Sequence, residues 1–217
     1  MTKEKKQYLM LALIAGLVII IDQIIKIVVK THMQIGESIP VIGNWFQILF
    51  VENEGMAFGM AFGGSTGKLL LSLFRLIAAI GVLWYLIRQI RRGQSSTGLV
   101  VSLSLILAGA VGNLIDCAFY GLIFDESYYH IARLFPPEGG YGTFLHGRVV
   151  DMFYFPIIDT ILPSWVPIWG GDHFVFFNAI FNFADSAITI GVIWLLILSV
   201  VSPKKTSQSD ENKKLEK

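Results

Sequence analysis

The chain has 217 residues, of which 54% are hydrophobic and 15% are charged, and its mean hydropathy is +0.63. A soluble domain is about 45–50% apolar and about 25% charged, so this composition indicates an integral membrane protein. The net charge of +1 gives no reason to expect a nucleic-acid partner. A single cysteine, Cys117, excludes an internal disulfide and a cysteine-cluster metal site, and the four histidines are too scattered for a local ligand motif. We therefore expect no metal and no other cofactor.

Four apolar segments are long enough to cross a hydrocarbon core of about 30 Å. The first is too long for the central region of a cleaved signal peptide, and no A-x-A-like site follows it, so we expect it to be retained. The sequence therefore predicts one membrane domain over 1–201, followed by a polar cytoplasmic tail at 202–217. The predicted spans are 8–29, 68–90, 98–120 and 178–201.

The basic residues predict how the spans are oriented. Eleven of the 17 lysines and arginines lie before the first span, between spans two and three, or after the fourth. With four spans these three segments share one side, which the positive-inside rule makes cytoplasmic. Both termini are then cytoplasmic, and the two remaining connections, 31–67 and 121–177, lie outside.

The two outer connections differ in character. Residues 45–51 are aromatic and β-branched, which favours a strand, and a turn is expected at 53–55. The longer connection, 121–177, is rich in aromatic residues, Pro and Gly, and its Trp165 and Trp169 suit the membrane–water interface. The expected fold class is an all-α membrane protein. It has four transmembrane helices, a small β-rich platform between spans one and two, and a long extracytoplasmic loop between spans three and four.

Span four contains two polar residues near its start, Asn182 and Asp185. They are three positions apart, so a helix over 178–201 would place them on one face. A carboxylate within a membrane span is costly and normally faces a protein interior or a water-filled cavity. Asp185 is therefore a functional-site hypothesis.

Span three ends in a similar pattern, with Asn113 three positions before Asp116. Gly109 and Gly112 come just before them, at a spacing that allows close approach of two helices. One such Asn–Asp pair could be a packing feature alone. Two pairs at similar depth indicate a shared polar site.

Spans one and two carry charges with two open interpretations each. Asp22 and Lys26 lie at i, i+4 in the favourable order, either as a structural ion pair or as an anchor for a neighbouring loop or a substrate. Arg75 is either an arginine that snorkels to the interface or the partner of an outer carboxylate.

A third acid, Asp151, lies in the second outer connection, in a loop surrounded by an apolar run, which predicts a place at the membrane boundary. Asp116, Asp151 and Asp185 then converge on the outer face. Two adjacent carboxylates cannot both ionise easily, so one keeps a proton. Such a pair supplies a base and an acid at once, which is enough to activate water against an amide.

Other classes of protein fit these residues less well. A proton-coupled transporter would use Asp22, Lys26 and Asp185 as a relay, but it predicts polar residues at mid-span depth, and those here cluster toward the outer end. A membrane scaffold held by Gly-x-x-Gly packing leaves three buried acids unexplained. Cys117 follows an apolar helix and fits a buried structural thiol better than a nucleophile.

Taken in order over roughly residues 8–200, five motifs resemble the lipoprotein signal peptidase (type II signal peptidase) family. Each motif alone is weak, whereas their joint order is specific. They are Asp22…Lys26, Asn53-x-Gly55-x-Ala57-Phe58, Gly109-x-x-Gly112-Asn113-Leu114-Ile115-Asp116, Gly147-x-Val149-Val150-Asp151 and Phe181-Asn182-x-Ala184-Asp185.

The resemblance implies an aspartic endopeptidase of the bacterial cytoplasmic (inner) membrane, with its active site at the outer leaflet. Such enzymes cut the signal peptide from a prolipoprotein just before a cysteine that carries diacylglycerol, and the cyclic peptide globomycin inhibits them. The family's catalytic dyad falls on Asp151 and Asp185, with Asp116 in a supporting position. Positions that line or support the site fall on Asn53, Gly55, Gly109, Gly112, Asn113, Asn182 and Ala184.

The chain departs from the family pattern in two places. The family usually has arginine after I-D, where this chain has Cys117, and Arg148 is a candidate to supply that charge. In addition, 34 residues separate Asp116 from Asp151, more than is usual in the family, as in longer members from Bacteroidetes-type bacteria. We expect the 45–51 strand to hold the substrate near the dyad and the 53–55 turn to close over it.

Overall fold

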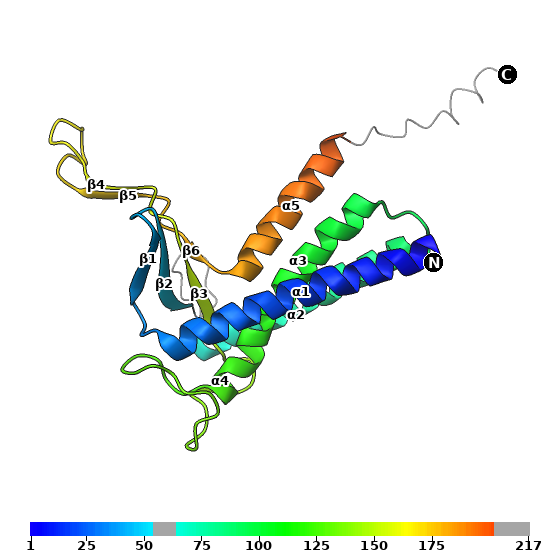
Figure 1. Cartoon of the computed structure of the whole chain (residues 1–217), viewed down its shortest axis with the longest axis horizontal. Helices are drawn as coiled ribbons and strands as arrows, with labels where there is room; N and C mark the ends of the chain where they lie inside the picture. Colours follow the sequence, from blue (N-terminus) through cyan, green and yellow to red (C-terminus); the bar gives the residue numbers. More distant parts are fainter. Residues whose placement is uncertain (54–63, 202–217) are drawn as a thin grey trace.

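The computed structural model describes residues 1–53 and 64–201 of the chain. Four helices in these residues are long and apolar enough to cross a membrane, as predicted. Figure 1 shows α1, α2 and α3 running from the N-terminal end toward a small sheet at the other end, and α5 rising from the sheet alongside α3. The bounds are α1 Lys3–His32, α2 Gly64–Arg91, α3 Thr97–Ile115 and α5 Phe183–Val201.

Helix α3 is the centre of the bundle, because half of its span is buried, against 17% for each of the other three. Its first turn is capped by the Ser96 hydroxyl, which accepts a hydrogen bond from the Leu99 N–H at 3.1 Å. Gly109 lies so close to α5 that a Cβ there would be 2.2 Å from the Ala184 carbonyl oxygen. The Gly-x-x-Gly spacing therefore does bring two helices together, as the sequence predicts.

Helix α3 continues through a π-helical segment, η1 (Asp116–Tyr120), into the short α4 (Gly121–Ile123). Single π-helical segments are rare and often occur at functional sites. Gly147 docks on this one: its N–H donates to the Cys117 carbonyl at 2.8 Å, and a Cβ on Gly147 would lie 1.9 Å from the Asp116 carbonyl oxygen. Only a glycine allows the chain to enter the next strand directly beside Asp116.

A four-stranded antiparallel sheet covers the end of the bundle, in the order β1-β2-β3-β6. Two strands come from each outer connection, so the sheet joins segments about a hundred residues apart. Val51 pairs with Asp151, and Asn53 pairs with Val149. The bounds are β1 Ser38–Ile42, β2 Phe46–Asn53, β3 Val149–Tyr154 and β6 Ile180–Phe181.

The sheet corrects three expectations. The all-α class is incomplete, since the strand predicted at 45–51 is confirmed as β2 but belongs to a larger sheet. Asp151 lies on β3, in the middle of buried residues, and not in a loop. The fourth span begins at Phe183, because 180–181 pair with β3. Each correction has the same cause, namely strand pairing across the chain that local sequence pattern does not reveal.

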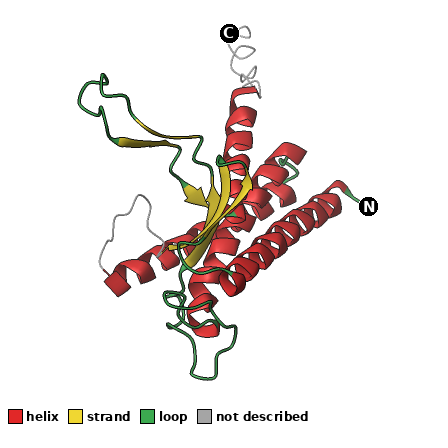
Figure 2. Cartoon of the chain, turned by 60° about the vertical axis from the view of Figure 1, so that its left-hand side comes forward, coloured by secondary structure: helices red, strands yellow, loops and turns green. Residues whose placement is uncertain are grey.

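A second, separate ribbon projects from the long connection. Strands β4 (Ile158–Ile161) and β5 (His173–Phe176) form a two-stranded antiparallel hairpin. Figures 1 and 2 show this hairpin reaching out from the sheet, clear of the helices. This hairpin is not predicted from the sequence, which leads us to expect a long loop over 121–177.

Candidate active site

The carboxyl group of Asp151 is buried between two asparagine amides. Its Oδ1 accepts a hydrogen bond from Asn182 Nδ2 at 2.7 Å, and its Oδ2 accepts one from Asn53 Nδ2 at 3.3 Å. Burial, and then the neighbouring Asp185 carboxylate, raise the pKa of the Asp151 carboxyl to about 7. The group can therefore hold a proton near neutral pH.

Asp185 lies in the first turn of α5 and is partly buried. Its Oδ1 accepts a hydrogen bond from Asn113 Nδ2 at 2.8 Å, and its Oδ2 accepts one from the Asn182 backbone N–H at 3.3 Å. Asn182 Oδ1 in turn accepts from the Asp185 N–H at 2.9 Å. These reciprocal bonds form a capping box at the start of the helix. Asn182 is thus the residue that caps the helix, and the expectation that it shares a helical face with Asp185 was wrong.

Asn182 connects the two acids. Its side-chain amide donates to Asp151 and also to Asn113 Oδ1 at 3.0 Å, while its side-chain oxygen receives the N–H of Asp185. Asn113 completes the circuit, since it donates to Asp185. The two N-x-x-D pairs predicted from the sequence therefore do meet in one polar site.

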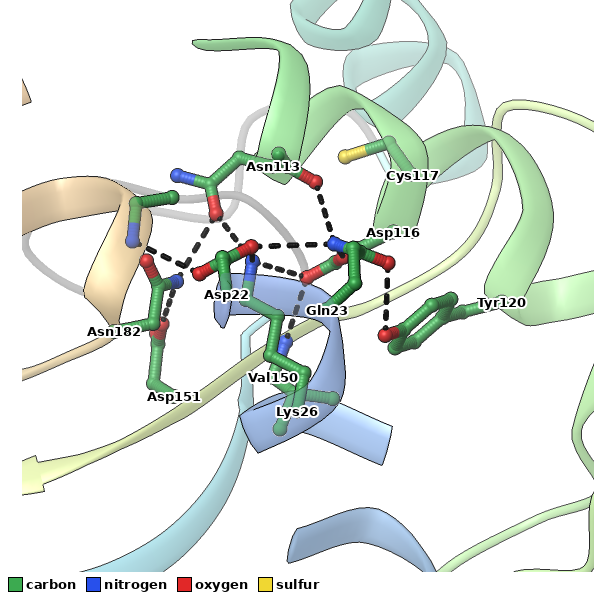
Figure 3. A network of polar contacts seen from close by, with 12 residues as sticks. Asp22, Gln23, Lys26, Asn113, Asp116, Cys117, Tyr120, Val150, Asp151 and Asn182 are labelled. Carbon is green, nitrogen blue, oxygen red and sulfur yellow. Dashed lines mark hydrogen bonds and ion pairs between the residues drawn. The ribbon is translucent and has the colours of Figure 1, made fainter. Parts of the chain in front are cut away.

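Beneath this site lies a buried ionic cluster, shown in Figure 3. Lys26 Nζ lies 2.8 Å from Asp22 Oδ2, 2.8 Å from Asp116 Oδ2 and 2.8 Å from Asn113 Oδ1, and the three charged side chains have no exposed surface. Two carboxylates share one ammonium group, so further donors are needed to stabilise them. One of these is Gln23, whose amide donates to Asp116 Oδ1 at 2.9 Å and to Asp22 Oδ2 at 3.2 Å.

The cluster also accepts hydrogen bonds from the backbone N–H groups of the residues that precede Asp185 and Asp151. Asp22 Oδ1 accepts the N–H of Ala184, which precedes Asp185, at 2.8 Å. Asp116 Oδ2 accepts the N–H of Val150, which precedes Asp151, at 3.3 Å (Figure 3). Of the two interpretations of the Asp22–Lys26 pair, the structure supports a structural ion pair that also anchors neighbouring segments. Sequence analysis missed Gln23, for which a polar residue inside an apolar span was the only signal.

Arg148 belongs to a different group of charges. Its guanidinium donates to Glu52 Oε2 at 3.1 Å and to Glu126, and it stacks over the Tyr141 ring at 4.7 Å from the centroid. Cys117, the position at which the family pattern has arginine, is approached by Arg75 of α2, whose Nη1 lies 3.2 Å from the thiol sulfur. Arg148 therefore lies among carboxylates at the edge of the sheet, and Arg75 contacts Cys117 on η1.

Three of the residues predicted to line or support the site are glycines. Gly109 and Gly112 provide close packing, since a Cβ on Gly112 would lie 2.8 Å from Asp22 Oδ2. Gly55, and with it most of the expected 53–55 turn, lies outside the residues that the structure describes. Across 1–53 and 64–201, no group of three or more His, Cys, Asp or Glu side chains is arranged to hold a metal ion.

The fold and this site define a multi-pass membrane protein with two coupled carboxyl groups at one end of its helix bundle. The chain belongs to the signal peptidase II family: the sequence model described as "Signal peptidase (SPase) II" matches residues 14–201. As a member of that family it is a lipoprotein signal peptidase, a protease with a lipoprotein substrate. The proton-coupled transporter interpretation finds no support.

Individual relatives agree with the family. The chain is 54% identical over 181 residues to a lipoprotein signal peptidase of Porphyromonas gingivalis, covering 83% of this chain and 78% of the relative. It is 37% identical over 199 residues to one of Amoebophilus asiaticus, covering 91% and 79%. A solved structure described as a bacterial membrane enzyme superposes with a TM-score of 0.59 at 29% identity, covering 92% of this chain and 93% of the other.

Proposed function

We propose that Asp151 and Asp185 are the catalytic dyad that removes the signal peptide from diacylglyceryl-modified prolipoproteins, by cleavage just before the lipid-modified cysteine. The observation that carries this proposal is the pair of amides, Asn182 and Asn113, which bind both carboxyl groups into one circuit. The raised pKa of Asp151 favours a pair that holds a single proton.

The chemistry follows from that shared proton. The ionised member of the dyad takes a proton from water, and the resulting hydroxide equivalent attacks the scissile carbonyl carbon. The protonated member donates its proton to the carbonyl oxygen, which gives a gem-diol. The member that took the proton from water passes it to the departing amine nitrogen as the C–N bond breaks, and the other member recovers a proton from a hydroxyl group of the gem-diol. Because the pair titrates as one unit, the two roles belong to the dyad. Asn182 and the backbone bonds from Asp22 and Asp116 fix the carboxyl groups before the substrate arrives.

The substrate approaches from the membrane. The diacylglyceryl chains stay among the lipids, and the signal peptide lies along the bundle, with β2 as a platform for the residues around the cut. The basic residues support an inner-membrane orientation with cytoplasmic termini: Lys3 and Lys5 lie at the start of α1 and Arg88 and Arg91 in the last turn of α2, at the bundle end opposite the dyad (Figure 1). The dyad then lies at the outer leaflet, and globomycin would compete with substrate there.

The test is cleavage of a purified, lipid-modified prolipoprotein by the full-length enzyme and by two variants, Asp151→Asn and Asp185→Asn. Each variant keeps the shape of the side chain but cannot exchange the proton, so we expect a loss of at least about 100-fold in kcat. Asp172→Asn, on an exposed loop, is the matched control and should remain fully active. Full activity in either dyad variant would disprove the proposal. Globomycin should inhibit cleavage by the parent enzyme, because it would compete with the substrate at the dyad.

A further inference from the structure

The β4–β5 hairpin is the one projecting feature that the site does not use. Residues 157–177 leave the sheet at β3 and return to it at β6 (Figure 1). A two-stranded hairpin is at best marginally stable alone in water and normally needs a third layer against it. Within the part of the chain that the structure describes, the two strands pair only with each other. The hairpin therefore lacks the layer that would stabilise it.

The two faces of the hairpin are chemically different. The register pairs Ile158 with Phe176 and Thr160 with Phe174, which puts four side chains with little polarity on one face. The opposite face pairs Asp159 with Val175 and Ile161 with His173, and the Asp159 and His173 side chains lie 2.5 Å apart. One face of the hairpin is therefore apolar except for Thr160, and both of the hairpin's ionisable side chains lie on the other, mixed face.

The tip of the hairpin is apolar and exposed. Between Thr160 and Gly171 the sequence, TILPSWVPIWGG, contains no charged residue. Trp165, Ile168 and Trp169 are 79%, 89% and 60% exposed. An exposed apolar surface of this kind marks a site of interaction with protein or membrane. The charged residue nearest to this stretch is Asp172, which directly follows Gly171, so residues 160–171 can be covered without the removal of a charge from water.

Much of the backbone of the tip is hydrogen-bonded within the loop. Five of its N–H groups, those of Leu162, Val166, Trp169, Gly170 and Gly171, and the N–H of the adjoining Asp172 donate to carbonyl groups within the loop. Two further positions are prolines, Pro163 and Pro167, which have no N–H to satisfy. Within lipid each unsatisfied backbone group is costly, so this internal pairing lowers the cost of insertion.

The tip also holds its apolar side chains outward at some backbone cost. Ile168 has a φ of 73°, in the left-handed region that a β-branched residue rarely adopts. At Gly170 a Cβ would lie 2.7 Å from the Ser164 carbonyl oxygen, so the loop can close only with glycine there. Ile168 is thus held in a costly backbone conformation while its side chain is almost fully exposed, which makes it a candidate for a functional contact.

The hairpin is continuous with the surface that faces lipid. Only six residues, 177–182, separate β5 from the membrane span α5, which at full extension is about 20 Å of chain. At the hairpin base Phe155 stacks on Phe46 at 4.6 Å and on Phe181 at 5.7 Å between ring centroids, so the base is fixed to the sheet. The tip is therefore held within reach of the bilayer surface at the dyad end of the bundle.

We propose that the β4–β5 hairpin is a membrane anchor whose tip, centred on Trp165, Ile168 and Trp169, inserts into the interfacial region of the lipid leaflet beside the dyad. Lipid supplies the missing third layer on the Ile158–Phe176 face, while Asp159 and His173 face water. Tryptophan at this depth is favoured because its ring is apolar and its N–H reaches the head groups. The anchor fixes the height of the sheet, and with it Asp151, relative to the membrane surface. This inference does not depend on which residues perform the cleavage.

The experiment measures where the tip lies in a membrane. Ile168→Cys in the full-length chain is labelled with a nitroxide and reconstituted into vesicles of phosphatidylethanolamine and phosphatidylglycerol. Accessibility to oxygen and to a water-soluble nickel chelate is then compared with two reference sites. Leu196→Cys, exposed on α5, reports lipid, and Glu138→Cys, at a side chain that is 71% exposed, reports water. Cys117 is buried, and the parent chain gives its background labelling.

We expect the label at 168 to resemble the lipid reference, with high access for oxygen and low access for the chelate. Access for the chelate equal to that at 138 would overturn the proposal, because the tip would lie in water. Low access for both reagents would also overturn it, in favour of a protein partner or a second copy of the chain. A label-free measurement guards against a distorted variant: lipids brominated near the head groups should quench the parent more than a Trp165→Phe, Trp169→Phe double variant. Equal quenching would count against the anchor.

Discussion

Asp22, on the first membrane span, accepts a hydrogen bond from the backbone N–H of Ala184 at the start of the last span, at 2.8 Å between Oδ1 and N. Ala184 immediately precedes Asp185, so the first and last spans are joined beside one member of the proposed dyad. Asp116 holds Val150, beside Asp151, in the same way. The ionic cluster therefore acts on the dyad through the backbone, and Lys26, which holds both carboxylates, is its centre.

Replacing Lys26 by methionine should destabilise the protein strongly. The variant keeps the apolar stem but leaves the Asp22 and Asp116 carboxylates buried without their ammonium partner. Removing one partner of a buried ion pair costs about 3–5 kcal/mol. Unfolding in detergent, followed by circular dichroism, measures the loss. Lys3→Met, at an exposed position, should be as stable as the parent.

A double variant tests the cause of the loss. Adding Asp116→Asn to Lys26→Met removes one of the unpaired charges and should restore part of the stability. A Lys26→Met protein as stable as the parent would contradict this account.

Replacing Gly109 by alanine should separate α3 from α5 and reduce cleavage. The added Cβ would lie 2.2 Å from the Ala184 carbonyl oxygen and 2.6 Å from Ile188 Cγ1, so α5 must shift. Overpacking of this kind costs about 1–3 kcal/mol. The shift moves Asp185, so we expect kcat to fall while the KM for prolipoprotein changes little. Gly81→Ala on α2 is the control, because nothing lies within 4 Å of a Cβ there and alanine favours a helix. Equal activity of the two variants would show that the helix contact is not critical.

Some of the contacts that these predictions test could be predicted from the sequence, and others could not. Hydropathy predicts the four spans because a membrane helix needs about 20 consecutive apolar residues, a signal that is local. The meeting of Asn113, Asp116, Asn182 and Asp185 was predictable because both pairs lie at the same depth. The pairing of β2 with β3 was not, since it joins residues about a hundred positions apart and depends on how the helices place them.

Asn182 shows a second limit. The spacing N-x-x-D fits one face of a helix and also fits a capping box, and periodicity alone does not separate the two. The cap is formed because β6 ends at Phe181 and the helix must begin directly after it. The position of Arg75 beside Cys117 had no local signal, since it depends on how α2 packs against α3.

The pH dependence of cleavage should report the proton on the dyad. The pKa of Asp151 is raised to about 7 in the folded protein, from an ordinary value of about 3.9. The native state thus binds this proton more tightly than the unfolded state does, and the contribution of this group to stability falls as pH rises from about 4 to about 7. Above about pH 7 the dyad loses its remaining proton, and with it the general acid, so kcat should decline.

A variant tests the assignment of that limb to Asp151. The Asn53 amide donates to Asp151 and lowers its pKa, so Asn53→Ala should move the alkaline limb to higher pH. Asn44→Ala, in the exposed turn before β2, should leave the limb in place. The measurement is kcat against pH for the parent and both variants. A limb that stays fixed in Asn53→Ala would mean that another group is titrating.

The last prediction concerns a buried group of charged side chains around Glu52, the residue that precedes Asn53 on β2. The Glu52 carboxylate is only 1% exposed, and it receives Lys30 from α1, Ser127 Oγ at 2.9 Å and Arg148 Nη1 at 3.1 Å. Lys30 also donates to Ser127 Oγ at 2.6 Å. Ser127 and Arg148 both come from the long segment between Asp116 and Asp151. That segment therefore clamps the end of β2 at the point where Asn53 meets Asp151.

Ser127→Ala removes one link of this clamp and leaves the Lys30–Glu52 ion pair in place. We expect a stability loss of about 1–2 kcal/mol, the usual cost of a lost buried hydrogen bond. If the clamp also positions Asn53, the alkaline limb of kcat should shift in the same direction as in Asn53→Ala, which a purely structural role would not produce. Ser38→Ala, at the exposed far end of the same sheet, is the matched control because it loses a hydrogen bond to Gln47 that lies far from the dyad. A Ser127→Ala enzyme that is less stable but has an unchanged pH profile would limit this segment to holding the fold together.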